Sequence, residues 1–350
     1  MRFFLLLLAC CAAAQDHDAV VRAFDTHNIV TFGEWHACKQ EHEWLRALVG
    51  TPQFADRVDD IVVEFGNSLY QKSIDRYIAG EAIPFEQARR AWRNVAGAIG
   101  PPSPVYEEFF KAVREVNLKR RGKHQLRVVL GDPYADWDTI QDREHLGPFV
   151  ANRDSWYVQV VKDEVLAKNH RALLVMGWGH FVRWNGPGKI EQQLQAAGAK
   201  TYFIVFGTNA VGGYDDLDKR FDSLTAPAVV DLQNGGWVGE LPAMPVLMGG
   251  IASSNALKLK DVADALLYVG PRDRLTQLFM PRSELEGTAY GKELARRYKI
   301  QTGGDINFAG YRDEAPAFER PPATASGGPP PIGAPPKSFH DPLPPRPPSK

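Results

Sequence analysis

The chain carries the stretch Ile-Val-Thr-Phe-Gly-Glu-Trp-His at residues 29–36, and this stretch decides which fold to expect. A second stretch, Leu-Leu-Val-Met-Gly-Trp-Gly-His at residues 173–180, repeats its form: an apolar run, then glycine, then histidine three residues after that glycine. Apolar β-forming residues that run into glycine are typical of a strand buried on both faces. Each stretch therefore predicts a buried strand whose carboxyl end presents a histidine, either His36 or His180.

Apolar runs and helical periodicities alternate along the chain on both sides of these two stretches. The apolar runs predict six strands, at residues 28–34, 60–66, 126–131, 172–177, 201–206 and 265–269. Apolar residues at helical spacing predict helices between them, at residues 38–49, 68–79, 85–98, 104–118 and 153–168. This alternation predicts an α/β fold, in which helices flank a parallel-dominated central sheet as a three-layer sandwich. The long connection 67–125 predicts a helical cap over a site.

Titratable side chains follow five of the predicted strands. Glu34 and His36 end the first strand, Glu64 ends the second, and Asp132 and His180 end the next two. Arg272 follows the last. Because parallel strands place their carboxyl ends along one edge of a sheet, where open α/β sheets bind ligands, these residues are expected to share a crevice.

Glu64 carries the most weight among these candidates, because a carboxylate inside a buried strand needs a partner or a chemical task. A lone Gly-x-x-His is by itself a weak signal, and Asp132 precedes proline, a pair that also makes a plain turn. We therefore take Glu34, His36, Glu64 and His180 as the candidate catalytic or metal-binding set, with Asp132 and Arg272 secondary.

Other side chains near the two histidines have simpler interpretations. Cys38, at the start of a predicted helix, is expected to be a small buried thiol. Glu41 and His42, on the same helix, are expected to face solvent or the rim of the crevice. Aromatic residues crowd both motifs and fit either a pocket lining or ordinary core packing: Trp35, Trp178, Phe181 and Trp184.

Composition excludes several classes of protein. The chain has 350 residues, is 44% hydrophobic and carries a formal net charge of −1, so no overall field favours nucleic acid or an anionic membrane. Beyond the first residues, no apolar stretch is long enough for a transmembrane span. Motifs for nucleotide phosphates, the serine nucleophile elbow and His-Glu-x-x-His are absent from the sequence.

The two ends of the chain differ from the middle in amino-acid composition. Residues 1–14 have one arginine, an apolar block and three alanines before Gln15, which predicts a cleaved signal peptide and export to the periplasm or the medium. Lipidation at Cys10 is the alternative. A proline-rich tail is expected to be disordered over 315–350. The domain between these ends is expected to span 15–314.

At these motifs the chain resembles the superfamily that groups erythromycin esterases, ChaN-type haem-binding lipoproteins, TraB and the Tiki metalloproteases. The resemblance covers residues 28–273 and rests on Gly-Glu-Trp-His at 33–36, Val-Glu-Phe-Gly at 63–66, Gly-Trp-Gly-His at 177–180 and the closing strand 265–270. It implies a site of Glu34, His36, Glu64 and His180. Because members of the superfamily differ in chemistry, the resemblance indicates the site better than the reaction.

These observations favour an exported hydrolase that acts on an ester or a peptide-type bond of a small-molecule or peptide substrate. In this hypothesis His36 or Glu64 activates water, His180 polarises or protonates the substrate, and Glu34 orients an imidazole or completes a metal site. Nitrogen and carboxylate donors together suit Zn or Mn. The alternatives are a ChaN-like protein that binds haem or another flat apolar ligand without catalysis, and an interaction protein that uses the proline-rich tail. The oligomeric state stays open.

Overall fold

The computed structural model describes residues 17–97, 102–184, 188–208, 220–221, 223–248, 257–306 and 312–317. Within these residues the chain forms a seven-stranded sheet in the spatial order β3-β2-β4-β1-β5-β7-β6. The strands are β1 (Ile29–Glu34), β2 (Asp60–Asn67), β3 (Arg127–Asp132), β4 (Ala172–Gly177), β5 (Thr201–Phe206), β6 (Ala228–Asp231) and β7 (Ala265–Tyr268). All six predicted strands are present and parallel, which confirms the fold class. The sequence did not predict β6, a short, half-buried edge strand antiparallel to β7.

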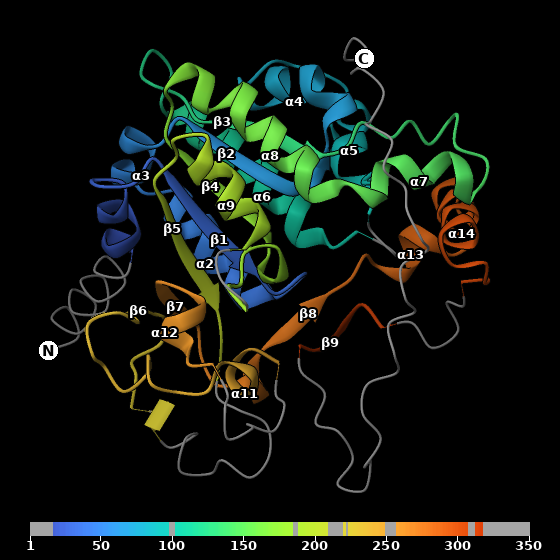
Figure 1. Cartoon of the computed structure of the whole chain (residues 1–350). Helices are drawn as coiled ribbons and strands as arrows, with labels where there is room; N and C mark the ends of the chain where they lie inside the picture. Colours follow the sequence, from blue (N-terminus) through green and yellow to red (C-terminus); the bar gives the residue numbers. More distant parts are fainter. Residues whose placement is uncertain are drawn as a thin grey trace, which may run out of the picture.

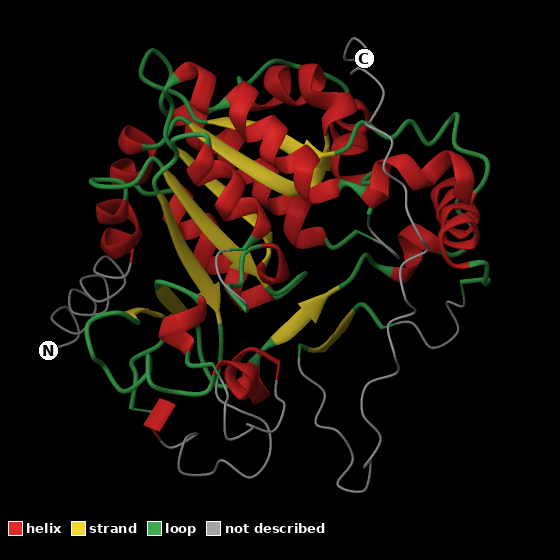
Figure 2. Ribbon diagram, in the orientation of Figure 1, coloured by secondary structure: helices red, strands yellow, loops and turns green. Residues whose placement is uncertain are grey.

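Helices cover both faces of the sheet, so the predicted three-layer sandwich is confirmed (Figures 1 and 2). One face packs against α2 (Lys39–Val49), α3 (Pro52–Arg57), α4 (Gln71–Ile78), α5 (Phe85–Arg93) and α6 (Pro104–Lys119). The other face packs against α8 (Arg153–Glu164) and α9 (Lys189–Ala196), which cross in front of the sheet in Figure 1. Successive residues of β2 alternate between the two cores: Ile61 and Val63 belong to the first, and Val62 to the second. This alternation is the period-2 geometry of a strand that is buried on both faces.

The long connection between β2 and β3 is part of this helical layer. It runs through η1 (Ser68–Tyr70), α4, α5 and α6, whose apolar residues join the same core as the sheet. The expected cap over 67–125 is therefore not a separate lid. Its α5 and the start of α6 border the cavity described below, at the carboxyl edge of the sheet.

Shorter elements complete the described fold. They are α7 (Arg143–Ala151), η2 (Leu166–Lys168), η3 (Trp178–His180), α11 (Ala243–Met248), α12 (Leu259–Val262), η4 (Arg272–Arg274), β8 (Thr276–Leu278), α13 (Arg282–Leu285), α14 (Ala289–Thr302) and β9 (Glu314–Pro316). β8 pairs antiparallel with β9 in a second, two-stranded sheet. Because Ala315 and Pro316 are in β9, the expected start of a disordered tail at 315 is wrong: their backbone hydrogen-bonds to β8.

The signal-peptide prediction, residues 1–14, lies outside the described residues, and so does the tail from 318 onward. Within the described part of the chain, every helix is too short or too polar to cross a bilayer.

Candidate functional site

The two Gly-x-x-His motifs meet because β1 and β4 are neighbours in the sheet. Glu34 lies opposite Gly177 in their parallel register. A Cβ atom at Gly177 would lie 2.7 Å from His36 Nε2, and a Cβ atom at Gly33 would lie 2.8 Å from the Cα atom of Trp178. Each glycine therefore leaves room for the turn that follows the other strand. The repeated motif is a mutual packing arrangement at the carboxyl edge of the sheet.

Glu34 and His36 form a hydrogen-bonded pair in this space. His36 Nδ1 lies 2.7 Å from Glu34 Oε1, and Glu34 is 1% exposed whereas His36 is 57% exposed. Burial lowers the pKa of His36, but the hydrogen bond and charge of Glu34 outweigh it and raise that pKa to about 9. Burial raises the pKa of Glu34, but the charge of His42 and the hydrogen bond from His36 outweigh burial and lower that pKa to about 2. The pair thus holds an accessible imidazole over a buried carboxylate.

Glu64 lies beside this pair and is buried as the sequence predicted. Its Oε2 accepts a hydrogen bond from the backbone N–H of Gly177 at 2.7 Å, and its Oε1 lies 3.0 Å from Arg153 Nη2. Burial raises its pKa, but the hydrogen bond from His180 and the charges of His36 and Arg153 hold that pKa well below its usual range. Glu64 is therefore an anion set among three cationic groups.

His180 reaches the site through Glu64. Its Nε2 lies 3.3 Å from Glu64 Oε1, and its Nδ1 lies 2.7 Å from Asp154 Oδ1. Burial lowers its pKa, but the bonds to Asp154 and Glu64 raise it to about 9. The described residues that line the cavity include Glu34, His36 and Glu64 but not His180. His180 is thus placed to hold Glu64, which differs from the expected direct contact with a substrate.

Asp132, a secondary candidate, is buried beneath the site. It accepts hydrogen bonds from Arg153 Nη2 at 2.9 Å and from the Tyr157 hydroxyl at 3.3 Å. Burial raises its pKa, and the charge of Arg153 opposes that shift. Asp132 therefore anchors Arg153, and Arg153 connects it to Glu64.

Arg272, the other secondary candidate, is not brought to the site. It lies in η4 after β7, and β5 separates β7 from β1. The cavity-lining residues of the described chain do not include it.

The expectation for Glu41 and His42 is wrong, because both side chains are 0% exposed. His42 Nε2 lies 2.6 Å from Glu34 Oε2, and Glu41 Oε2 accepts a hydrogen bond from the Trp35 backbone N–H. The periodicity of α2 predicted its apolar side correctly. Helix α6 packs against α2, however, and its Tyr106 ring lies against His42, so this polar residue is buried as well. His42 thus belongs to the site as a second donor to Glu34.

Arg153 and Asp154 are the other functional candidates that the sequence analysis missed. They occupy the first turn of α8, a helix that the sequence predicted from its apolar positions alone. Charged residues in the first turn of this predicted helix were the available signal.

The turn after His36 is held by the C-terminal segment. Ala37 has a φ of 65°, in the left-handed region that side chains rarely adopt, at a cost of about 1–2 kcal/mol. The backbone N–H of Leu278 in β8 donates to the Ala37 carbonyl, and the Gln277 side chain donates to the His36 carbonyl. Cys38 is buried as expected, and burial raises the pKa of its thiol to about 12. Strand β8 therefore fixes the backbone that carries His36.

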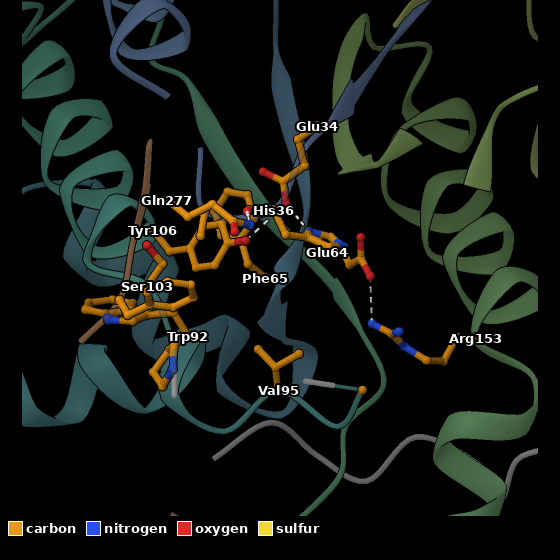
Figure 3. A pocket seen from close by; sticks show the side chains of 14 residues that line it. Glu34, His36, Glu64, Phe65, Trp92, Val95, Ser103, Tyr106, Arg153 and Gln277 are labelled. Atoms are coloured by element: carbon orange, nitrogen blue, oxygen red, sulfur yellow. Dashed lines mark hydrogen bonds and ion pairs between the residues drawn. The ribbon is translucent and has the colours of Figure 1, made fainter. Parts of the chain in front are cut away.

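A cavity of about 390 Å³ opens beside His36 (Figure 3). Glu34, His36, Glu64 and Arg153 line its polar end. The aromatic lining comes from Phe65, Trp92, Tyr106 and Phe279. The four aromatic residues next to the motifs do not line it: Phe181 packs against Phe203, Trp178 packs against Trp184, and Trp35 joins another apolar cluster. Of the two interpretations of those four residues, core packing agrees with the structure.

The donor atoms needed for a metal lie together, but they are engaged in hydrogen bonds. Glu34, His36 and Glu64 each offer a ligand atom within 4.8 Å of the others, and His180 is outside this cluster. Both Glu34 oxygens accept hydrogen bonds, from His36, His42 and Tyr106. Both Glu64 oxygens do so as well, and the guanidinium of Arg153 already supplies a positive charge beside them. A divalent ion would displace these bonds, so the residues fit an acid–base site better than a metal site.

The sequence matches no family model, and no curated protein matches it significantly. Among solved structures, a mutant of the erythromycin esterase EreC in its open conformation is similar with 12% identity and a TM-score of 0.45, over 73% of this chain and 93% of that chain. A succinoglycan biosynthesis protein is similar with 8% identity and a TM-score of 0.48, over 72% of this chain and 90% of that chain. Haem-bound ChaN of Campylobacter jejuni is similar with 12% identity and a TM-score of 0.33, over 57% of this chain and 88% of that chain. At these scores the likeness is one of general α/β architecture.

Proposed function

We propose that this protein is a hydrolase that cleaves an ester or peptide-type bond with His36 as the general base. The observation that carries the proposal is the orientation of His36. Its Nδ1 is held by the buried Glu34 carboxylate, and its Nε2 is next to Gly177 at the wall of a cavity. An imidazole oriented by a carboxylate, with its other nitrogen free to meet water, is the arrangement that general-base catalysis requires.

The proposed step begins with neutral His36. Its Nε2 takes a proton from water as the water oxygen bonds to the substrate carbonyl carbon, and the carbonyl oxygen becomes an oxyanion. The oxyanion then re-forms the carbonyl, the bond to the leaving oxygen or nitrogen breaks, and that atom receives the proton from Nε2. Glu34 stabilises the imidazolium through Nδ1–H, and the positive charge of Arg153 at the cavity wall offsets the oxyanion.

Glu64 and His180 have positioning roles in this scheme. Glu64 fixes Arg153 and, through the Gly177 N–H, the end of β4. His180, held by Asp154, is the second donor to Glu64 Oε1, beside Arg153. Both oxygens of Glu64 already accept hydrogen bonds, so this scheme assigns the activation of water to His36 and not to Glu64.

The test is hydrolysis of p-nitrophenyl esters and of a fluorogenic peptide library by purified protein, compared between the parent chain, His36→Asn and His170→Asn. His170 is the matched control, since its Nδ1 also pairs with a buried carboxylate, Asp60, at the amino end of β2. We expect hydrolysis that His36→Asn lowers at least about 100-fold, that His170→Asn leaves unchanged and that chelators do not affect. Loss of activity with a chelator would favour the Zn or Mn alternative. Absence of hydrolysis together with a Soret band on haem addition would favour the ChaN-like binder.

We also propose that the chain is exported and that its mature form starts at Gln15, because residues 1–14 have the pattern of a signal peptide. Mass spectrometry of the protein from the periplasm or the medium tests this. An intact Met1 would contradict export by this route, and a lipidated Cys10 would indicate the lipoprotein alternative.

A further inference from the structure

The cavity beside His36 has two chemically different ends. The polar end carries Glu34, Glu64 and Arg153, and the other end is walled by Phe65, Trp92 and Phe279 with the ring of Tyr106. In Figure 3 Trp92 and Tyr106 lie on one side of the cavity and Arg153 on the opposite side, with His36 and Glu64 between. A ligand whose reacting bond lies at His36 therefore has its remaining part among aromatic rings.

The two hydroxyl groups at the aromatic end, those of Tyr106 and Ser103, are engaged within the protein. The Tyr106 hydroxyl donates to Glu34 Oε1 at 3.2 Å. The Ser103 hydroxyl donates to the Leu278 carbonyl and accepts from the backbone N–H of Val105. A polar ligand group that entered this end would find no hydrogen-bond partner in these two hydroxyls. Burying a polar group without a hydrogen bond costs free energy. The aromatic end thus selects an apolar ligand group.

Charge at the polar end is balanced. The two carboxylates, Glu34 and Glu64, are accompanied by two cationic groups, Arg153 and the His180 imidazolium that holds Glu64, so the charges balance while His36 is neutral, as the proposed step requires. Each carboxylate oxygen accepts a hydrogen bond already, so no negative site is left to pair with an ammonium group. A cationic ligand would gain little here, in spite of the aromatic rings, which by themselves also suit quaternary ammonium groups.

We propose that the site takes a small, neutral ester with an aromatic ring, bound with the ring between Phe279 and the rings of Trp92 and Phe65 and with the scissile carbonyl beside His36. The cavity of about 390 Å³ lies at the small end of the range for ligand pockets, which suits one ring and a short acyl group. This inference rests on the proposed hydrolase function and names its substrate class.

The experiment compares benzyl acetate with 2-methoxyethyl acetate, whose leaving alcohols have similar basicity, and with acetylcholine. We expect kcat/KM for benzyl acetate to exceed that for each of the others by about tenfold or more. Phe279→Ser should reduce this preference to near unity. Phe149→Ser, which changes another half-buried phenylalanine that does not line the cavity, should leave it intact.

Binding is measured separately with 4-phenylbutan-2-one, the ketone that matches benzyl acetate but cannot be hydrolysed. Saturation-transfer NMR should detect its ring in the parent protein, and Phe279→Ser should weaken its Kd about tenfold. Ketone binding without ester hydrolysis would refute the hydrolase and keep the ligand class. Ester hydrolysis with no preference for the ring, a preference for acetylcholine, or ketone binding that Phe279→Ser does not change would refute the ligand class.

Discussion

Gly177→Ala tests whether the position of His36 limits catalysis. The added Cβ atom would lie 2.7 Å from His36 Nε2, whereas ordinary contacts begin at 3.4 Å, so the ring must retreat by about 0.7 Å. Misplacement of a reacting group by about 1 Å can cost about 100-fold in rate, so we expect a loss of about 30- to 100-fold in kcat/KM. Gly177 has φ −50° and ψ 133°, a conformation open to alanine, and His36 is 57% exposed, so its ring can shift toward solvent. The free energy of unfolding should therefore change by less than about 1 kcal/mol.

Gly179→Ala is the matched control, because a Cβ atom there meets nothing within 4 Å. The assay measures kcat/KM on the best ester from the panel and the urea unfolding midpoint for both variants and the parent. Full activity in Gly177→Ala would show that the reaction does not depend on His36 where the structure places it. Unfolding of Gly177→Ala in step with lost activity, or equal loss in Gly179→Ala, would also refute the reasoning.

Three further predictions concern the charges around the site. The pKa of His36 is raised to about 9, so this base is protonated at neutral pH. The value of kcat/KM should therefore rise about tenfold per pH unit up to about pH 9, and a plateau reached below pH 7 would contradict this prediction. His42→Phe leaves Glu34 Oε2 buried without its donor, so we expect a loss of about 3 kcal/mol in urea unfolding. Because loss of His42 moves the pKa of Glu34 from about 2 toward its ordinary value of 4.5, the stability lost as the pH falls from 4.5 toward 2 should become smaller than in the parent, and an unchanged acid limb would refute the role of His42. Glu64→Gln removes a charge from the buried pair with Arg153, so it should cost about 3 kcal/mol of stability. Because the charge of Glu64 helps to raise the pKa of His36, the rise of kcat/KM with pH should also move to lower pH, whereas lost stability with an unchanged profile would make Glu64 purely structural.

The sequence predicted the strands that carry the site and the residues at their carboxyl ends well, because the signals for these features are local. Continuous apolar runs identified all six parallel strands, and the carboxyl ends of neighbouring parallel strands lie together wherever the rest of the chain goes. Glu34, His36 and Glu64 therefore converge as expected, and His180 joins them through Glu64. The role of each in a reaction stays a prediction.

The sequence could not predict which polar side chains from other helices hydrogen-bond to these strand-end residues. His42 follows the rule for an exposed residue on an amphipathic helix, yet Tyr106 of α6, 64 positions later in the chain, covers it. Arg153 reaches Glu64 and Asp132 only because α8 packs across the strands that carry them. Periodicity describes one element at a time, and these contacts depend on how two elements pack.

Sequence alone thus determined the six parallel strands, their common edge and the acidic and imidazole groups that follow them, because each of these depends on residues that are neighbours in the chain. Tertiary structure decided the hydrogen-bond partners, the shifted pKa values and the aromatic wall of the cavity. Trp92 and Phe279 belong to segments far apart in the sequence, and the pairing of β8 with β9 and of Gln277 with the His36 carbonyl brings the later segment back to the site. The physical reason is that desolvation and hydrogen bonding act over a few ångströms in space, and the order of residues along the chain does not fix those distances.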